Sequence, residues 1–333
     1  MMGRRAIRTV GILGMTGLLA LPLLASDRTW AAEQKPLVNL KIHASVSATS
    51  PYGKRMNVFV ERVAERTGGK VKMLNFAGGQ LGNDNQAMES MNLGTIAAAY
   101  QFTSGYPAWD LLLSLYLFRD RDHMWKVMRG PTGKRLIEAF EKAKNIKVVS
   151  MFYFAEAHMA LTKPVRTLAD FKGLKIRVPP LPSMLAGFKA LGSSAIPMAF
   201  TEVYTAMKQG TIDGLENPYD VLISSGYHEI AKYLVLSGHR MGVLEFMMAR
   251  PIWDQMTPET QAIVLDEAQK AADDIEKEIL ENEKQYIETF KKAGVEMIQP
   301  DVAAFRNAVK DVWKEFMPRL WPAGLYEEMQ AVR

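Results

Sequence analysis

Apolar residues recur along this chain at two spacings, one typical of strands and one typical of helices. Residues 37–46 and 70–76 are short, largely apolar runs that predict strands. Between them Met56, Phe59 and Val63 repeat at helical spacing, and two glycines then end the predicted helix. Strand and helix patterns continue to alternate through the first half of the chain, which indicates an α/β unit with a mostly parallel sheet.

A second alternating run begins with the sequence GLKIRVPP at residues 173–180. Leu174, Ile176 and Val178 share one face of the predicted strand, and Arg177 lies on the other face. The two prolines end this strand, because proline has no N–H for the ladder of a sheet. Two such runs predict an α/β fold of two lobes. The expected division is a lobe I of residues 38–154 plus about 243–275 and a lobe II of residues 155–242 plus about 276–333.

One helix is predicted to be much longer than the others. Thr257 is its expected N-cap, Pro258 its first residue and Gly294 its stop signal. Thirty-five residues at 1.5 Å each would reach about 50 Å, so we expect this helix to span both lobes. Its apolar strip begins with the spacing of a coiled coil, but Glu278 and Asn282 occupy the next two positions of that series and disfavour this alternative.

The basic charge of the chain is concentrated at its start. The net charge is +5, but residues 1–32 carry four arginines and one aspartate and account for +3 of it. The remainder is therefore close to neutral, and no stripe of interleaved basic and aromatic residues follows. We expect no binding of nucleic acid.

The first 32 residues have the organisation of an export signal. A basic start precedes an apolar stretch, and small residues follow that would allow cleavage after Ala31 or Ala32. The apolar stretch is shorter than the ~20 residues of a spanning helix, which disfavours an uncleaved membrane anchor. Arg4 and Arg5 leave open whether export uses the Sec or the twin-arginine route. The mature chain is expected in the periplasm, and with no cysteine it forms no disulfide there.

The sequence is poor in catalytic patterns. The five histidines have no metal-binding spacing, and no nucleophile elbow of the form G-x-S-x-G is present. The glycine-rich residues 78–82 could hold an anion at a helix start, but they lack the lysine of a phosphate loop and the spacing of a dinucleotide-binding motif, so a tight turn explains them better. We expect no enzymatic activity, no metal and no cofactor.

Three motifs carry a resemblance to a known family. DFKGLKIRVPP, PMAFTEVYTAMKQGTIDGLENP and HEIAKYLVLSGH occur in this order between residues 170 and 239. GGKVKMLNFAGGQLGND precedes them, and together they resemble the solute-binding proteins of tripartite ATP-independent periplasmic (TRAP) transporters. The resemblance covers nearly all of residues 38–320. It implies a periplasmic-binding-protein-like fold, in which two lobes close about a hinge on a ligand held between them.

The resemblance also implies the residues of the ligand site. Arg177 would face the cleft and grip a carboxylate, for which its planar fork of donors is well matched. Asn217 would hydrogen-bond the carboxylate, Phe200 would pack on the ligand and Asp84 would reach in from lobe I. The alternatives are a solvated strand residue for Arg177, a turn residue for Asn217, a core residue for Phe200 and a helix cap for Asp84.

Two further sets of residues follow from the same resemblance. Glu216 and His239 would form a buried polar pair behind the cleft. Some members place a second arginine twenty residues before the first, where this chain has Ala157. Its neighbours Glu156 and His158 are included among the candidate ligand-binding residues. The missing cation makes sialic acid a doubtful ligand, because it removes a charge-assisted hydrogen bond of roughly 1.5–3 kcal/mol.

The implied function is that of a receptor outside the cytoplasm. It would be a monomer that binds a small organic acid and delivers it to the membrane subunits of a TRAP transporter. The alternative is a similar binding protein that serves a periplasmic signalling receptor.

Overall fold

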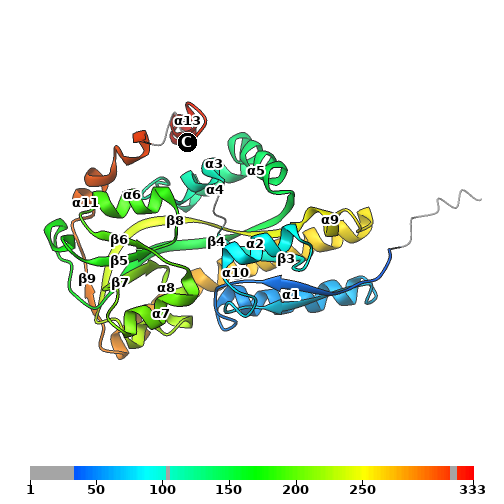
Figure 1. Ribbon diagram of the computed structural model, residues 1–333, viewed down its shortest axis with the longest axis horizontal. Helices are drawn as coiled ribbons and strands as arrows, with labels where there is room; N and C mark the ends of the chain where they lie inside the picture. Colours follow the sequence, from blue (N-terminus) through cyan, green and yellow to red (C-terminus); the bar gives the residue numbers. More distant parts are fainter. Residues whose placement is uncertain (1–33, 103–105, 316–320) are drawn as a thin grey trace, which may run out of the picture. The chain divides into compact units, whose positions relative to one another are not determined.

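The computed structural model describes residues 34–102, 106–315 and 321–333 (Figure 1). The predicted signal peptide, residues 1–32, lies outside the described residues. Within the described part of the chain no helix is long and apolar enough to cross a membrane.

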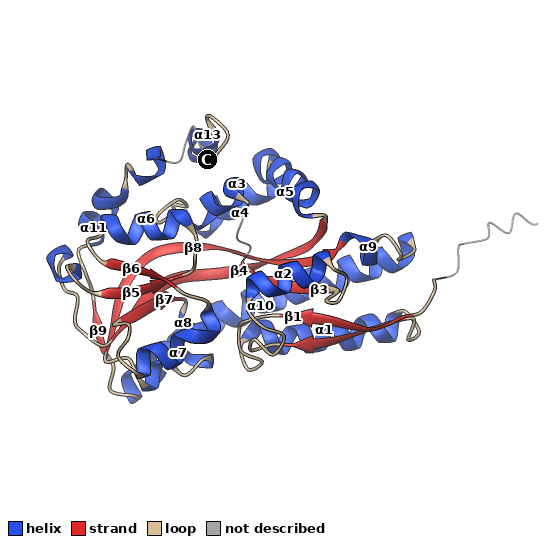
Figure 2. Ribbon diagram, in the orientation of Figure 1, coloured by secondary structure: helices blue, strands red, loops and turns tan. Residues whose placement is uncertain are grey.

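The described residues contain a single mixed sheet of nine strands (Figure 2). Their order is β2-β1-β3-β8-β4-β7-β5-β6, and β9 pairs with β8. The strands are β1 (Leu37–His43), β2 (Val71–Phe76), β3 (Ala98–Gln101), β4 (Ile146–Leu161), β5 (Lys175–Val178), β6 (Ser194–Pro197), β7 (Gly214–Asn217), β8 (Tyr233–Ala249) and β9 (Glu296–Ile298).

Two long antiparallel strands, β4 and β8, join the two ends of this sheet (Figure 1). β8 pairs with β3 at residues 245–248 and with β9 at residues 233–235. β7 pairs with β4 at residues 158–161. Two of the three shifts in the register of β4 against β8 flank Ala157, between the two groups of shorter strands, and the third lies between Val148 and Ser150. Among the described residues five of the eight strand pairings are parallel, as the sequence predicted. The three antiparallel pairings all involve β4 or β8, and β8 had not been listed as a strand.

Helices accompany these strands in the alternation expected from the sequence. They are α1 (Pro51–Arg66), α2 (Asp84–Asn92), α3 (Pro107–Asp110), α4 (Arg121–Arg129), α5 (Pro131–Lys144), α6 (Pro182–Ala190), α7 (Phe200–Lys208), α8 (Tyr219–Ser224), α9 (Arg250–Trp253), α10 (Pro258–Lys292), α11 (Val302–Val309) and α13 (Leu325–Ala331). The long helix is confirmed as α10, and the side chain of Thr257 caps it by accepting from the N–H of Thr260.

The buried apolar residues form three clusters, and α10 reaches two of them. Val264 and Ile275 of α10 belong to the cluster that fills the space around β1, β2 and β3. Phe290, near the other end of α10, belongs to a cluster with residues of α7 and α8. The C-terminal helix α13 contributes Leu325 and Met329 to the first cluster, although its residues had been assigned to lobe II. The lobe boundaries as a whole stay a prediction.

Candidate ligand-binding cavity

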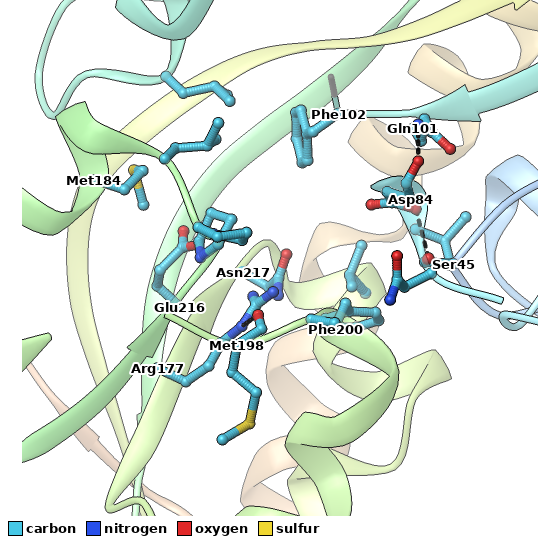
Figure 3. Close-up of a pocket in the computed structure, with 18 of the residues that line it drawn as sticks. Ser45, Asp84, Gln101, Phe102, Arg177, Met184, Met198, Phe200, Glu216 and Asn217 are labelled. Carbon is cyan, nitrogen blue, oxygen red and sulfur yellow. Dashed lines mark hydrogen bonds between the residues drawn. The ribbon is translucent and has the colours of Figure 1, made fainter. Parts of the chain in front are cut away.

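A cavity of about 270 Å³ lies where residues from distant parts of the chain meet (Figure 3). Ser45, Asp84 and Gln101 come from the segments around β1, α2 and β3. Arg177 and Asn217 come from β5 and β7 at the other end of the sheet. The cavity is thus lined from both groups of short strands.

Arg177 is held in the wall of this cavity. It lies on β5 between β6 and β7, and only 4% of the residue is exposed. Its Nε donates to the carbonyl of Met198 at 2.9 Å, and its guanidinium lies 5.6 Å from the ring centre of Phe200. Neither Nη atom hydrogen-bonds to a described residue. Burial lowers the pKa of Arg177 while Glu216 opposes that shift, and a guanidinium remains charged at any relevant pH. The alternative of a solvated strand arginine was wrong.

Asn217 and Phe200 also line the cavity, as the resemblance implied. Asn217 is the last residue of β7 and is 5% exposed, so the strand rather than a mobile turn positions its amide. Phe200 is the first residue of α7 and is only half-buried, with its ring 6.1 Å from that of Tyr227. The partly exposed ring is therefore part of the cavity wall.

Asp84 begins α2 and turns its carboxylate toward the cavity (Figure 3). The Oγ of Ser45 donates to its Oδ1 at 2.5 Å, and the Nε2 of His43 lies 3.3 Å from the same oxygen. The side chain of Asn83 caps α2, so the alternative of a helix cap was wrong for Asp84. Its second oxygen, Oδ2, has no hydrogen-bond partner among the described residues and is available as an acceptor.

Glu216 and His239 form a buried pair, and a third residue joins it. Glu216 lies on β7 at 1% exposure and lines the cavity. Its Oε2 accepts from Nη2 of Arg240 at 2.6 Å and from Nε at 3.2 Å, and the Nε2 of His239 is 3.4 Å away. Burial alone would raise the pKa of Glu216, but Arg240 and His239 bring it below the ordinary value. His239 does not line the cavity.

Glu156 and His158 do not line the cavity. They flank Ala157 on β4. Glu156 is exposed. His158 is buried and stacks on Tyr219 at 4.4 Å, and burial lowers its pKa to about 3. It is therefore a neutral ring with a packing role.

The sequence analysis missed Arg240 and the apolar wall of the cavity. Arg240 follows directly after the quoted motif that ends at His239. A charged residue inside the apolar run of β8 was the signal that could have identified it. The apolar wall includes Leu113, Phe102, Phe154, Leu181, Met184 and Leu244. Among the described residues no three His, Asp or Glu side chains are grouped so as to hold a metal ion.

Comparison with known proteins agrees with the family resemblance drawn from the sequence motifs. The model of a family described as bacterial extracellular solute-binding protein, family 7 (DctP), matches residues 42–319. The 2,3-diketo-L-gulonate-binding periplasmic protein YiaO of Escherichia coli is 34% identical over 273 residues, which cover 78% of this chain and 82% of that protein.

Solved structures resemble the fold closely. A TRAP periplasmic solute-binding protein from Polaromonas sp. JS666 bound to D-erythronate has a TM-score of 0.84 at 29% identity, covering 89% of this chain and 99% of that one. One from Xanthobacter autotrophicus Py2 with bound β-D-galacturonate has a TM-score of 0.82 at 28% identity, covering 89% and 100%.

Proposed function

Because the chain belongs to family 7 of the bacterial extracellular solute-binding proteins, the receptors of TRAP transporters, we propose that it binds a sugar acid in the cavity around Arg177. Proteins of this family are periplasmic substrate-binding receptors and not enzymes. The bound acid would be delivered to the membrane subunits of a TRAP transporter.

The observation that best supports this proposal is that Arg177 is buried while its two Nη atoms have no hydrogen-bond partner among the described residues. Its Nε donates a hydrogen bond to the carbonyl of Met198, which fixes the plane of the guanidinium. Both Nη atoms are left without a partner among the described residues, in a side chain that is almost fully removed from water. A carboxylate offers two oxygens in the geometry of that fork and compensates its charge. Asn217 and Phe200 in the same wall would then contact the carboxylate and the body of the ligand.

The charges of the cavity favour a ligand with one carboxylate. Arg177 and Arg240 supply two positive charges, and the three acidic residues Asp84, Glu202 and Glu216 supply three negative charges. A ligand with one carboxylate adds one negative charge to these groups, whereas a ligand with two carboxylates adds two. In a site of low exposure the second charge carries the larger electrostatic cost.

The ligands of relatives suit these features. The relatives named above bind 2,3-diketo-L-gulonate, D-erythronate and β-D-galacturonate, each a hydroxylated acid. In this chain Asp84 Oδ2 would accept a hydrogen bond from a ligand hydroxyl. The apolar wall would face the carbon chain.

We further propose that two lobes close on the ligand. The support is a cavity lined from both groups of short strands, with register shifts in β4 and β8 between those groups. Such shifts are places where a sheet bends. The boundaries 38–154 plus about 243–275 and 155–242 plus about 276–333 remain those proposed from the sequence, apart from α13, which packs with the first cluster.

We also propose that the signal peptide of residues 1–32 directs export and that the protein is a monomer. The alternative, delivery to a signalling receptor, would be favoured if the neighbouring gene encoded a sensor kinase. Neighbouring genes for a small and a large membrane subunit would favour transport.

A thermal-shift screen tests the binding proposal. The panel contains 2,3-diketo-L-gulonate, D-erythronate, L-galactonate and β-D-galacturonate, with erythritol as a control that keeps hydroxyls but lacks the carboxylate. An acid present at 100 times its Kd should raise the free energy of unfolding by about 2.7 kcal/mol. Stabilisation by none of the acids, or equal stabilisation by erythritol, would count against a carboxylate receptor.

A further inference from the structure

Arg240 is a second arginine in the wall of the cavity, and the sequence motifs did not include it. It is 3% exposed, and its guanidinium lies 5.3 Å from the ring centres of both Phe102 and Phe154. Nε and Nη2 donate to Glu216, whereas Nη1 is buried without a hydrogen-bond partner. A buried N–H without an acceptor is costly, so the position is built for an acceptor that enters the cavity.

The position of Arg240 depends on the residue opposite it. Ala157 on β4 pairs with Arg240 on β8. Side chains of directly opposed residues in an antiparallel pair lie on the same face of the sheet. The methyl group of Ala157 therefore leaves this face open for the long side chain from the neighbouring strand.

The pairing with Glu216 determines which acceptor fits. Glu216 is 1% exposed and lies 2.6 Å from Nη2, so it neutralises the charge of Arg240. Nη1 is then an unpartnered N–H group with little net positive charge, in a side chain that lines the cavity. Such a donor suits a hydroxyl or carbonyl oxygen better than a second carboxylate, which would meet Glu216 at close range.

We infer that Arg240 is a specificity-determining residue whose Nη1 donates to a hydroxyl oxygen of a sugar acid already held by Arg177, and whose pairing with Glu216 excludes a second carboxylate at that position. This inference rests on the proposed function and extends it. Among acids of equal length the site selects a polyhydroxy monocarboxylate over the dicarboxylate with the same carbon chain.

Isothermal titration with matched acids tests this assignment. The probes are D-erythronate with meso-tartrate, and L-galactonate with galactarate, where the second acid of each pair has a carboxylate in place of the terminal hydroxymethyl group. The singly deoxygenated counterparts of the two aldonates complete the set. The unaltered protein should bind each aldonate at least about tenfold more tightly than its dicarboxylate, and one deoxygenation should cost about tenfold.

The variant Arg240→Lys keeps the charge beside Glu216 and removes the Nη1 donor. It should bind the aldonates about tenfold more weakly, and the deoxygenation that mattered in the unaltered protein should now cost less than twofold. Arg250→Lys is the matched control, because Arg250 pairs with Glu141 just past the end of β8 and does not line the cavity. If Arg240→Lys weakened every acid equally and kept the deoxygenation penalty, Arg240 would have only a structural role and the inference would fail.

Glu216→Gln provides a second test if Arg240→Lys does not fold. It preserves the shape of the side chain but restores the positive charge of Arg240. The preference for D-erythronate over meso-tartrate should then fall by about tenfold or more. An unchanged preference would overturn the charge argument while leaving the carboxylate grip of Arg177 intact. Failure of the unaltered protein to bind any of the acids would instead overturn the proposed function, and this inference with it.

Discussion

Replacing Arg177 tests the grip on the ligand most directly. The structure leaves two Nη groups for a carboxylate, because Nε already donates to Met198. Arg177→Ala removes both charge-assisted bonds and leaves a buried carboxylate unpaired, so the loss should be about 2–5 kcal/mol of binding free energy. Arg177→Lys keeps the charge, but one ammonium cannot reproduce the planar fork and also bond to Met198. Its affinity should fall by at least about tenfold.

The assay is isothermal titration of both variants with the acid that stabilises the protein most in the thermal-shift screen. Arg166→Ala is the control, because Arg166 is exposed and pairs with Glu296 at the surface. Circular dichroism should show that all three variants fold. Binding by Arg177→Ala within about 0.5 kcal/mol of the unaltered protein would refute the reasoning, since that is the range expected for a surface substitution.

Three other outcomes are expected. Small-angle scattering should give a smaller radius of gyration with saturating ligand than without it, and superimposable curves would argue against closure. N-terminal sequencing of periplasmic protein should begin after Ala31 or Ala32, whereas an intact Met1 in the membrane fraction would contradict export with cleavage. Burial raises the pKa of Asp220 in α8 to about 7. The folded state therefore holds this proton more tightly than the unfolded state, and the resulting stability, present at pH 4, should be lost as the pH rises through 7. Asp220→Asn should abolish this pH-dependent loss of stability. Urea titrations in which the free energy of unfolding of both proteins depends on pH in the same way would contradict the assignment to Asp220.

The sequence predicted the local elements better than their connections. Thr257 and Pro258 specify the start of α10 by local hydrogen bonding and backbone geometry, and both were identified from neighbouring residues alone. β8 was missed because its seventeen residues are buried almost throughout and show neither a two-residue nor a helical period. Its antiparallel pairing with β4 joins residues between 72 and 103 positions apart, from Leu161 with Tyr233 to Ile146 with Ala249, which no local pattern encodes.

The candidate site was also predicted only in part from the sequence. The resemblance placed Arg177, Asn217, Phe200 and Asp84, and all four line one cavity. It also suggested Glu156 and His158, which do not line the cavity. The charge of Arg240 inside the apolar run of β8 was a signal in the sequence, but its position opposite Ala157 depends on the register of β4 against β8.

The pairing of Ala157 with Arg240 matters for how ligand preference is compared among relatives. A sequence alignment examines each column separately, and the column that contains Ala157 reports a missing cation. Two facing strand positions contribute to the same region of space, however, so a hydrogen-bond donor can be supplied from either one. The quantity to compare between proteins is therefore the occupancy of a facing pair, because a comparison of single columns overlooks a donor on the opposite strand.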